Sequence, residues 1–489
     1  MLVDALIEAA RRAPNAPAVA DQHLSLNYRQ LSRLSSVFRR LVARETTCPR
    51  VGLMLPASAV FPAALMGALW SGKTAIPLNF LLRPEELKRI VQDAQIDLIV
   101  AVRPFAELAA ALPCRTVFVE DLPLKREVFF AMFHSLPPAP RVNPDDTAVI
   151  LYTSGTTAEP KGVELTYGNL HSNCTDSIHS LEIDSRHKFL NILPPFHIFG
   201  LTANVLVPIC LRIAVYALPR FSPIAAVRAI EQQGITLILA IPSMYAAMLR
   251  VKSASRESFQ SIRLAISGGE PLPDSVRTAF QERFGVVLRQ GYGLTETSPV
   301  VSACLVKAYK VGTVGPVIRN VTVRIVGPDE RELPTGQDGE ILVRGPNVMK
   351  GYYRKPEETR RVIDEAGWFH TGDIGRLDAD GFLSITGRLK EMLIIGGENV
   401  FPREIEAVLE AHEAVLQAAV IGVPDGLRGE SPVAFVIPKK DAQASEEALR
   451  TFARQHLAGF KTPKRIVIRE DLPTGPTGKI LKRRLRDLL

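Results

Sequence analysis

The sequence predicts a large N-terminal domain of α/β subdomains with a small β-rich subdomain, followed by a compact C-terminal α+β domain. Up to about residue 300, short apolar runs alternate with amphipathic stretches, which is the pattern of an α/β fold. From about residue 311 to 386 the segments are short, rich in β-forming residues and interrupted by glycine, proline and aspartate. After residue 387 a final unit mixes helical and strand patterns. We therefore divide the chain into domains 1–389 and 390–489.

The individual elements follow from local periodicity and composition. In the α/β part, strand-like apolar runs occupy residues 51–55, 98–102, 116–119, 148–151, 235–240 and 264–266. In the β-rich part, strands are predicted at 321–326, 339–344 and 382–386. The last unit is predicted to contain helices at 403–412 and 446–456 and strands at 418–423 and 433–437.

Composition and local signals exclude several classes of protein. Residues 51–72 carry no charge, but prolines, glycine and serines interrupt them, so we expect a strand and a buried helix rather than a transmembrane segment. We interpret the apolar stretch 192–218 in the same way. The five scattered cysteines form no C-x-x-C pair, which argues against a disulfide framework and a structural zinc site. Because the first residues lack the pattern of a secretory signal, we expect a cytoplasmic protein.

The charge of the chain favours a polyanionic ligand. Its net charge is +8, and residues 479–486 include five basic side chains. Nucleic acid is excluded as the ligand because the basic residues have neither interleaved aromatics nor zinc-finger spacing. Apart from Lys479, we interpret the basic side chains of this terminal stretch as a solvated helix face. Peripheral contact with an anionic membrane surface stays open.

Residues 152–162 predict a phosphate-binding loop. They follow an apolar strand and combine hydroxyl side chains, glycines and a lysine. Glycines let backbone N–H groups approach an anion closely, and hydroxyls and an ammonium group add donors and charge. A plain loop is the alternative, because such clusters often follow strands. The candidate phosphate ligands in this loop are Thr153, Ser154, Gly155, Thr156, Thr157 and Lys161.

A second segment, residues 67–74, matches the pattern G-x-x-x-x-G-K-[ST] of nucleoside-triphosphatases. That pattern requires a strand before it and a helix after it. Here a run of helix formers precedes it and a strand-like run follows, so the order is reversed. We therefore predict that the match is accidental and that Gly72 ends a helix.

Further segments need a joint explanation. Residues 267–271 and 290–299 each follow a strand-like run, so we expect loops at strand ends, where open α/β sheets bind ligands. The remaining segments are 193–200, 368–373, 387–390, 396–406 and 473–480. Together with the phosphate-binding loop, their residues and their order resemble the motif set of the adenylate-forming superfamily, which comprises acyl-CoA synthetases, firefly-luciferase-like enzymes and peptide-synthetase adenylation domains. The resemblance spans roughly residues 5 to 485.

The resemblance implies a two-step reaction with ATP, Mg²⁺ and coenzyme A. A carboxylate attacks the α-phosphorus of ATP to give an acyl-adenylate and pyrophosphate, and a thiol then takes the acyl group. Within this scheme the phosphate-binding loop lies on the β- and γ-phosphates, Thr295 contacts the α-phosphate and Glu296 holds Mg²⁺. The alternative for Glu296 is a surface or capping carboxylate.

The resemblance also assigns residues to the adenosine part of ATP. Tyr292 offers an aromatic face to adenine, and Gly268 and Gly269 permit close approach on the other side. Asp373 accepts hydrogen bonds from the ribose hydroxyls and Arg388 donates to the same sugar, although an aspartate that merely forms a turn is an alternative. The same binding set includes Glu270, Gly291 and Gly293.

For the C-terminal domain the resemblance implies rotation between the two steps. Lys479 is the predicted catalytic residue of the first step, where its charge reaches both the carboxylate and the α-phosphate; an ordinary surface lysine is the alternative. Lys390 is the expected hinge. After rotation, Gly396 and Gly397 are expected to line the tunnel for the pantetheine arm of coenzyme A.

The acyl substrate is predicted from residue types. Residues 196–206 contain no carboxylate for an amino-acid substrate, and Gly291 stands where malonate-type relatives carry an arginine. The wall candidates are mostly apolar, although ordinary core packing would also explain them: Ile198, Phe199, Ile241, Ser243, Met244, Leu294 and Val300. We therefore expect a medium- or long-chain fatty acid, or alternatively an aryl acid, with His197 as a gate or a neighbour of the carboxylate. Coenzyme A is the expected acceptor and acyl carrier protein the alternative.

Overall fold

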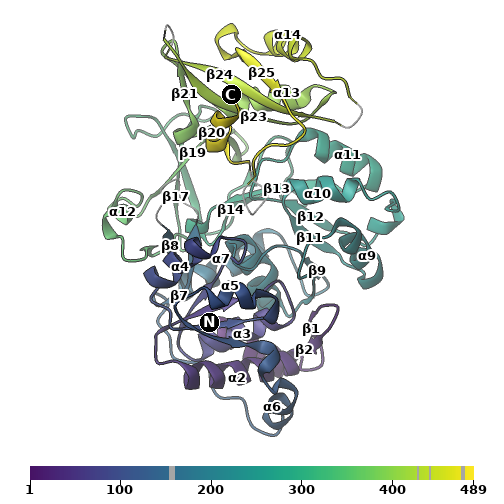
Figure 1. The fold of residues 1–489 in the computed structure, drawn as a ribbon, viewed down its shortest axis with the longest axis vertical. Coiled ribbons are helices and arrows are strands. Elements are labelled where there is room, and N and C mark those ends of the chain that lie inside the picture. Colours follow the sequence, from purple (N-terminus) through teal and green to yellow (C-terminus); the bar gives the residue numbers. More distant parts are fainter. Residues whose placement is uncertain (154–159, 427–428, 440–441, 475–479) are drawn as a thin grey trace.

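The protein is described by a computed structural model, which covers residues 1–153, 160–426, 429–439, 442–474 and 480–489, with the backbone alone at Lys125. Ser154, Gly155, Thr156, Thr157 and Lys479, all predicted to be functional, lie outside the described residues. The described residues form four sheets, and the sheet nearest the C-terminus lies at one end of the long axis (Figure 1). This mixed architecture confirms the predicted fold class.

Two largely parallel sheets form the α/β part. The first has the order β18-β8-β7-β4-β3-β5-β6 and the second β14-β13-β12-β11-β9-β10-β1-β2. The strands of the first are β3 Arg50–Met54, β4 Thr74–Pro77, β5 Leu98–Ala101, β6 Arg115–Phe118, β7 Thr147–Thr153, β8 Lys161–Thr166 and β18 Gly351–Tyr352. The strands of the second are β1 Pro17–Ala20, β2 Ser25–Asn27, β9 Lys188–Asn191, β10 Ala214–Ala217, β11 Leu237–Ala240, β12 Leu264–Ser267, β13 Leu288–Gly293 and β14 Val300–Ala303. All six predicted strands of this part are found, with ends shifted by a few residues at most.

Helices pack on these sheets. They are α1 Leu2–Arg12, α2 Tyr28–Glu45, α3 Val60–Trp70, α4 Pro84–Asp93, α5 Ala106–Ala110, α6 Leu124–Ala131, α7 Tyr167–Ser180, α8 Val207–Leu211, α9 Pro223–Gln233, α10 Pro242–Leu249 and α11 Asp274–Phe284. The helix α3 is apolar on all sides and is buried from Phe61 onward, in a core that both sheets share. No helix in the described part of the chain is long and apolar enough to cross a membrane.

The segment that matches the triphosphatase pattern is the end of α3 and the start of β4. Gly72 has φ +76°, its N–H donates to the carbonyl of Leu69, and the N–H of Lys73 donates to that of Ala68, which is a Schellman helix end. Lys73 Nζ donates to the carbonyl of Cys48 at 2.5 Å. A Cβ on Gly67 would lie 2.4 Å from Cβ of Phe38, so this glycine allows α2 and α3 to pack closely. The predicted order of helix before strand is confirmed.

The β-rich part forms an antiparallel sheet of order β15-β20-β19-β17-β16. Its strands are β15 Gly315–Pro316, β16 Thr322–Val326, β17 Gly339–Arg344, β19 Phe369–Leu377 and β20 Phe382–Arg388, and the short helix α12 Pro356–Arg360 lies between β18 and β19. After β20 comes the single turn Leu389–Glu391, which contains Lys390.

The last sheet has strands β21 Leu393–Ile395, β22 Glu398–Val400, β23 Val415–Asp425, β24 Gly429–Pro438 and β25 Arg465–Ile468. On one face, Leu409 of α13 Pro402–Ala411 and Leu449 of α14 Glu446–His456 join the apolar core, and on the other face Leu472 and Leu485 do so. Burial of both faces explains the long apolar runs that predicted β23 and β24.

The prediction for the end of the chain is wrong. Residues 482–484 and 486–488 form two short 3₁₀ turns rather than a helix with a solvated face. Lys482 Nζ lies 2.6 Å from a carboxylate oxygen of Glu391 and 2.8 Å from one of Glu406, and Leu485 is fully buried. These two carboxylates raise the pKa of Lys482 against the lowering effect of burial. The sequence spacing of the basic residues could not reveal these acidic partners.

Candidate active site

Asp373 is held by two of the residues that were predicted to accompany it. The phenol of Tyr292, in β13, donates to Asp373 Oδ2 at 2.7 Å, and Nε of Arg388 donates to Oδ1 at 2.7 Å. Asp373 and Arg388 are paired neighbours across β19 and β20, so the register of this hairpin sets their contact. The carboxylate is 2% exposed.

The electrostatics of these three side chains follow from burial and charge. Burial raises the pKa of Tyr292, and the Asp373 carboxylate raises it further, so the phenol stays protonated and donates. Burial alone would lower the pKa of Arg388, but Asp373 raises it. Each carboxylate oxygen has a second lone pair, so Asp373 can accept two more hydrogen bonds, as from neighbouring hydroxyls of a sugar.

Part of the segment 290–299 is not the loop that was predicted. Gly291, Tyr292 and Gly293 lie within β13 and pair with β14. A Cβ on Gly293 would lie 1.9 Å from the carbonyl oxygen of Pro299, so glycine is required by the turn itself. The run before residue 290 was correctly predicted as a strand, but the strand continues to Gly293 because β14 pairs with it.

Glu296 lies in the single turn Thr295–Thr297 that follows β13. Its Oε1 accepts a hydrogen bond from the phenol of Tyr352 at 3.0 Å, and its backbone carbonyl accepts one from Met349 N–H at 2.8 Å. Burial raises the pKa of Glu296, while the hydrogen bond from Tyr352 opposes that rise. The turn therefore presents a half-buried carboxylate that favours protonation or a nearby cation.

Two buried asparagines fix this turn. The side-chain amide of Asn173, from α7, donates to the carbonyl of Val300 at 2.8 Å, and that of Asn347 donates to the carbonyls of Thr297 and Val300 at 3.1 and 3.2 Å. Because buried backbone carbonyls need donors, these amides hold the position of Glu296. Both asparagines are distant in sequence, and the sequence reasoning missed them.

The phosphate-binding loop connects the antiparallel strands β7 and β8. Thr153 and Lys161 are paired neighbours at the two ends of this loop. Nζ of Lys161 forms an ion pair with Glu358 and lies 5.4 Å from the ring centroid of Tyr352. Tyr352 thus has Glu296 at its hydroxyl and the Lys161 ammonium over its ring, and it links the loop to the carboxylate.

Tyr352 and Glu358 were also missed by the sequence reasoning. They lie 56 and 62 residues after Glu296, in β18 and α12. Residues 351–358 hold two tyrosines, a lysine and two glutamates, which was a usable signal.

The segment around His197 lies beside the glycines that follow β12. A Cβ on Gly268 would lie 3.2 Å from the ring of Phe199 and 3.5 Å from the carbonyl oxygen of Gly291, whereas Gly269 has φ +83° and the side chain of Ile241 nearby. Glu270 follows in the same loop. A side chain at position 268 would require the ring of Phe199 to shift by a few tenths of an ångström.

His197 is neutral near pH 7 because burial lowers its pKa to about 4. Its Nε2 is buried and has no hydrogen-bond partner among the described residues. A neutral imidazole can donate one hydrogen bond to a carboxylate but supplies no charge. A buried nitrogen without a partner is compatible with the predicted neighbour of a substrate carboxylate.

Two of the C-terminal candidates lie in a hairpin turn. Gly396 and Gly397, both with positive φ, are the central pair of a two-residue hairpin between β21 and β22. A type I′ turn requires two such residues, so the hairpin alone explains both glycines. Lys479 lies outside the described residues; next to it in the sequence, Thr474 pairs with Ile480 and Leu481 N–H donates to the carbonyl of Pro473 at 2.8 Å.

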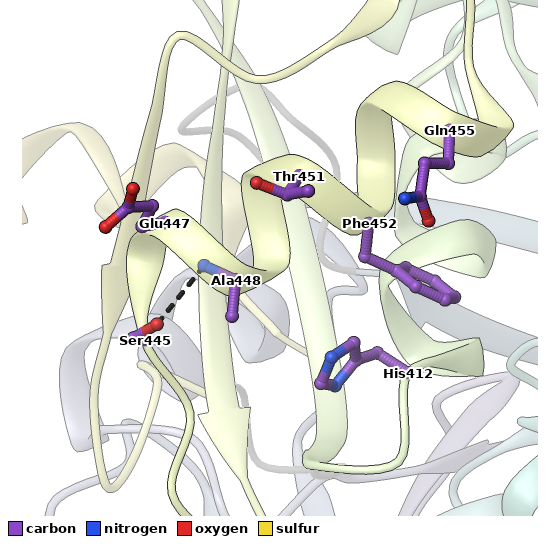
Figure 2. Close-up of a pocket in the computed structure, with 7 residues that line it drawn as sticks. All are labelled: His412, Ser445, Glu447, Ala448, Thr451, Phe452 and Gln455. Carbon is purple, nitrogen blue, oxygen red and sulfur yellow. Dashed lines mark hydrogen bonds between the residues drawn. The ribbon is translucent and has the colours of Figure 1, made fainter.

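A surface hollow in the C-terminal part of the chain is lined by His412, Ser445 and residues of α14 (Figure 2). His412 lies on one side of it and the exposed face of α14 on the other, with Phe452 set edge-on to the imidazole at 5.0 Å. The hollow contains no cluster of groups that could perform catalysis, and we assign it no function.

The chain matches two family patterns. Residues 6–353 match that of the AMP-binding enzymes, and residues 404–479 match that of the AMP-binding enzyme C-terminal domain. A feruloyl-CoA synthase of Amycolatopsis sp is 35% identical, with 98% of this chain and 97% of that protein covered. A long-chain-fatty-acid–CoA ligase of Bacillus subtilis is also 35% identical, with 89% and 85% covered.

Solved structures with a similar fold cover nearly the whole chain. ATP-bound MatB from Rhodopseudomonas palustris has a TM-score of 0.90 at 30% identity, with 100% of this chain and 99% of that chain covered. O-succinylbenzoate coenzyme A synthetase from Bacillus subtilis, in complex with ATP and magnesium ion, has a TM-score of 0.84 at 27% identity, with 99% of both chains covered. The protein belongs to the AMP-binding enzyme family. Within the adenylate-forming superfamily it is an AMP-forming acid–coenzyme A ligase that uses ATP and Mg²⁺.

The described residues fit a magnesium ion that is held mainly by substrate. They contain no group of three or more His, Cys, Asp or Glu side chains that could hold a metal. Enzymes of nucleotides commonly bind Mg²⁺ through one or two carboxylates and the phosphates. The half-buried Glu296, whose pKa is raised by burial, is a suitable single carboxylate.

Proposed function

We propose that the protein ligates a medium- or long-chain fatty acid to coenzyme A through an acyl-adenylate. The observation that carries this proposal is the apolar character of the surface beside Gly268 and Gly269. Phe199, Ile241, Met244 and Leu294 are partly buried at the edge of the main core, and Ile198 is buried in it. No charged side chain occurs in residues 196–206, and glycine occupies position 291. An uncharged acyl tail suits such a wall because its transfer from water is favourable.

The proposed roles follow from charge. A carboxylate is a weak nucleophile toward an anionic phosphate, so the protein must neutralise and align the two groups. Lys161, released from Glu358, and the loop after Thr153 bind the β- and γ-phosphates. Glu296 holds Mg²⁺, which neutralises phosphate charge, and Thr295 contacts the α-phosphate.

The nucleoside and the acid are held by different strands. Asp373 accepts from the ribose hydroxyls beside Tyr292 and Arg388, while Gly268, Gly269, Glu270, Gly291 and Gly293 shape the surface around the adenine. His197 donates a hydrogen bond from its free Nε2 to the substrate carboxylate. This last role is supported by the buried, unpartnered nitrogen of a neutral imidazole.

Domain rotation is part of the same proposal. Domains 1–389 and 390–489 rotate at Lys390, so that Lys479 serves the first step and then withdraws. Gly396 and Gly397 then approach the pantetheine arm of coenzyme A. Support comes from the single turn Leu389–Glu391 that joins the two domains and from the exposed glycine hairpin.

An aryl acid is the second candidate for the substrate. The feruloyl-CoA synthase matches this chain as well as the fatty-acid ligase does, at 35% identity, and the ring of Phe199 offers a stacking face.

One substrate panel separates these candidates. The purified protein is supplied with ATP, Mg²⁺ and acids from acetate to dodecanoate, oleate, coumarate and ferulate, with either coenzyme A or acyl carrier protein as acceptor. We expect AMP and thioester with dodecanoate or oleate and coenzyme A. A higher kcat/KM for ferulate would replace the fatty acid by the aryl acid, and thioester on carrier protein alone would replace the acceptor.

A further inference from the structure

A cluster of exposed apolar side chains lies on α6 and the residues that follow it. Phe129, Phe130, Met132 and Phe133 are 60%, 54%, 37% and 72% exposed, and we call them the α6 patch. The other large exposed apolar side chains of the described residues are scattered singly along the chain. Exposed apolar residues that gather in one place mark an interaction surface, whereas scattered ones do not.

The aromatic rings of the patch pack on one another outside the protein core. Phe129 meets Phe130 edge-on at 5.9 Å and Phe133 edge-on at 5.1 Å. The opposite side of α6 packs against the protein, because Ala131 is buried and Val128 contacts the main core. The patch is therefore an additional apolar face that nothing in this chain covers within the described residues.

The patch lies beside a basic helix. Arg33 of α2 donates to the carbonyl of His134, and Arg40 of α2 pairs with Glu127 of α6 at 3.3 Å. The two helices lie together at the end of the molecule opposite the C-terminal sheet (Figure 1). Their sequences contain seven basic and two acidic residues, so this pair carries +5 of the net charge of +8.

We propose that the α6 patch and the basic residues of α2 form a docking surface for an anionic lipid bilayer. Phenylalanine side chains enter the interface between headgroups and acyl chains, and arginines beside them are attracted to anionic headgroups. Contact at this end leaves the C-terminal domain facing water. The inference depends on this surface alone and does not require that the substrate be a fatty acid.

Other occupants fit the surface less well. A symmetric contact with a second copy would bring the same positive charges close to one another. Nucleic acid would need ring faces that successive bases can stack on, but here the rings are turned edge-on to one another at 71° and 74° on a short exposed helix. An anionic bilayer uses both the exposed rings and the positive charge.

The test is flotation of the full chain with vesicles. We expect binding to phosphatidylcholine vesicles that contain phosphatidylglycerol, weaker binding to phosphatidylcholine alone, and loss of binding as salt is raised. The double variant Phe129→Ser/Phe133→Ser is expected to bind at least about tenfold more weakly, because two apolar rings no longer leave water. The control Ile224→Ser removes an apolar side chain on α9 that is 52% exposed, and it is expected to bind like the original protein.

Further measurements on the double variant distinguish the possible outcomes. Thermal unfolding and ligase activity in solution are expected to be unchanged in the double variant, because neither phenylalanine lies in the core or at the site. Failure of the original protein to bind, or equal binding by the double variant, would overturn the proposal. A change of oligomeric state in the double variant, or an oligonucleotide that competes with the vesicles, would assign the surface to a second copy or to nucleic acid instead.

Discussion

Tyr352→Phe is expected to shift the acid side of the pH profile while leaving the plateau of activity in place. In the structure the Tyr352 phenol donates to Glu296 Oε1 at 3.0 Å, and this bond favours the ionised carboxylate against the effect of burial. In the proposed site Glu296 must be ionised to hold Mg²⁺, so we expect activity to fall as the pH falls through its pKa, which burial raises above the ordinary value of 4.5. Without the phenol, that pKa rises further.

The size of the shift follows from the hydrogen bond. A bond to a charged group contributes about 1.5 to 3 kcal/mol, and solvent at this half-buried site reduces that contribution, so we expect the acid limb to move up by about one pH unit. The assay is the pH dependence of kcat/KM for ATP at limiting Mg²⁺. Tyr353→Phe is the matched control, because the ring of Tyr353 lies near Arg50, 5.6 Å from its guanidinium carbon. An unmoved acid limb in Tyr352→Phe, or a loss of activity equal at every pH, would refute the reasoning.

Three further predictions concern other parts of the chain. Lys161→Ala is expected to raise the KM for ATP at least about tenfold in initial-rate measurements, because a cation on the phosphates is lost. The control Lys73→Ala should leave this KM unchanged, since Lys73 donates to a backbone carbonyl. A larger rise of the KM in Lys73→Ala than in Lys161→Ala would contradict the proposed site. Gly67→Ala is expected to lower the free energy of unfolding in urea by about 1 to 3 kcal/mol, because the new Cβ meets Phe38. The control Gly459→Ala adds a Cβ in open space and should unfold like the original protein. Equal free energies of unfolding in the two variants would rule out the packing role of Gly67. Lys482→Met is expected to cost about 3 kcal/mol at neutral pH, because among the described residues the buried Glu406 then keeps only Arg403, at 3.9 Å, as a charged partner. Lys461→Met breaks an exposed pair and is expected to cost less than about 1 kcal/mol, so similar losses in urea unfolding would contradict the buried network.

Local pattern was sufficient for the six predicted strands of the α/β part and for the buried helix that precedes Gly72. The runs that became β3, β5, β11 and β12 are apolar throughout because both sides of a parallel sheet are covered, and such runs are visible in the sequence. The order of helix before strand at Gly72 could also be predicted from the local sequence. The structure at the end of the chain could not, because the partners of Lys482 are 76 and 91 residues away.

Contacts between residues that are distant in sequence also limited the prediction of the candidate site. Tyr292 and Asp373 are 81 residues apart, and only the resemblance to a known family placed them together. No residue-by-residue rule indicated that Tyr352 would donate to Glu296, because that contact depends on how β18 is added at the edge of the first sheet beside β8. Contacts of this kind follow from the tertiary arrangement and not from spacing along the chain.

The most direct test is a crystal structure of the protein with a stable dodecanoyl-adenylate analogue. We expect its ribose hydroxyls within hydrogen-bond distance of Asp373, its phosphate beside Thr295, and its alkyl chain against Phe199 and Ile241. An analogue bound at residues 67–74, or one whose alkyl chain points into water away from Phe199, would contradict the proposed fatty-acid ligase.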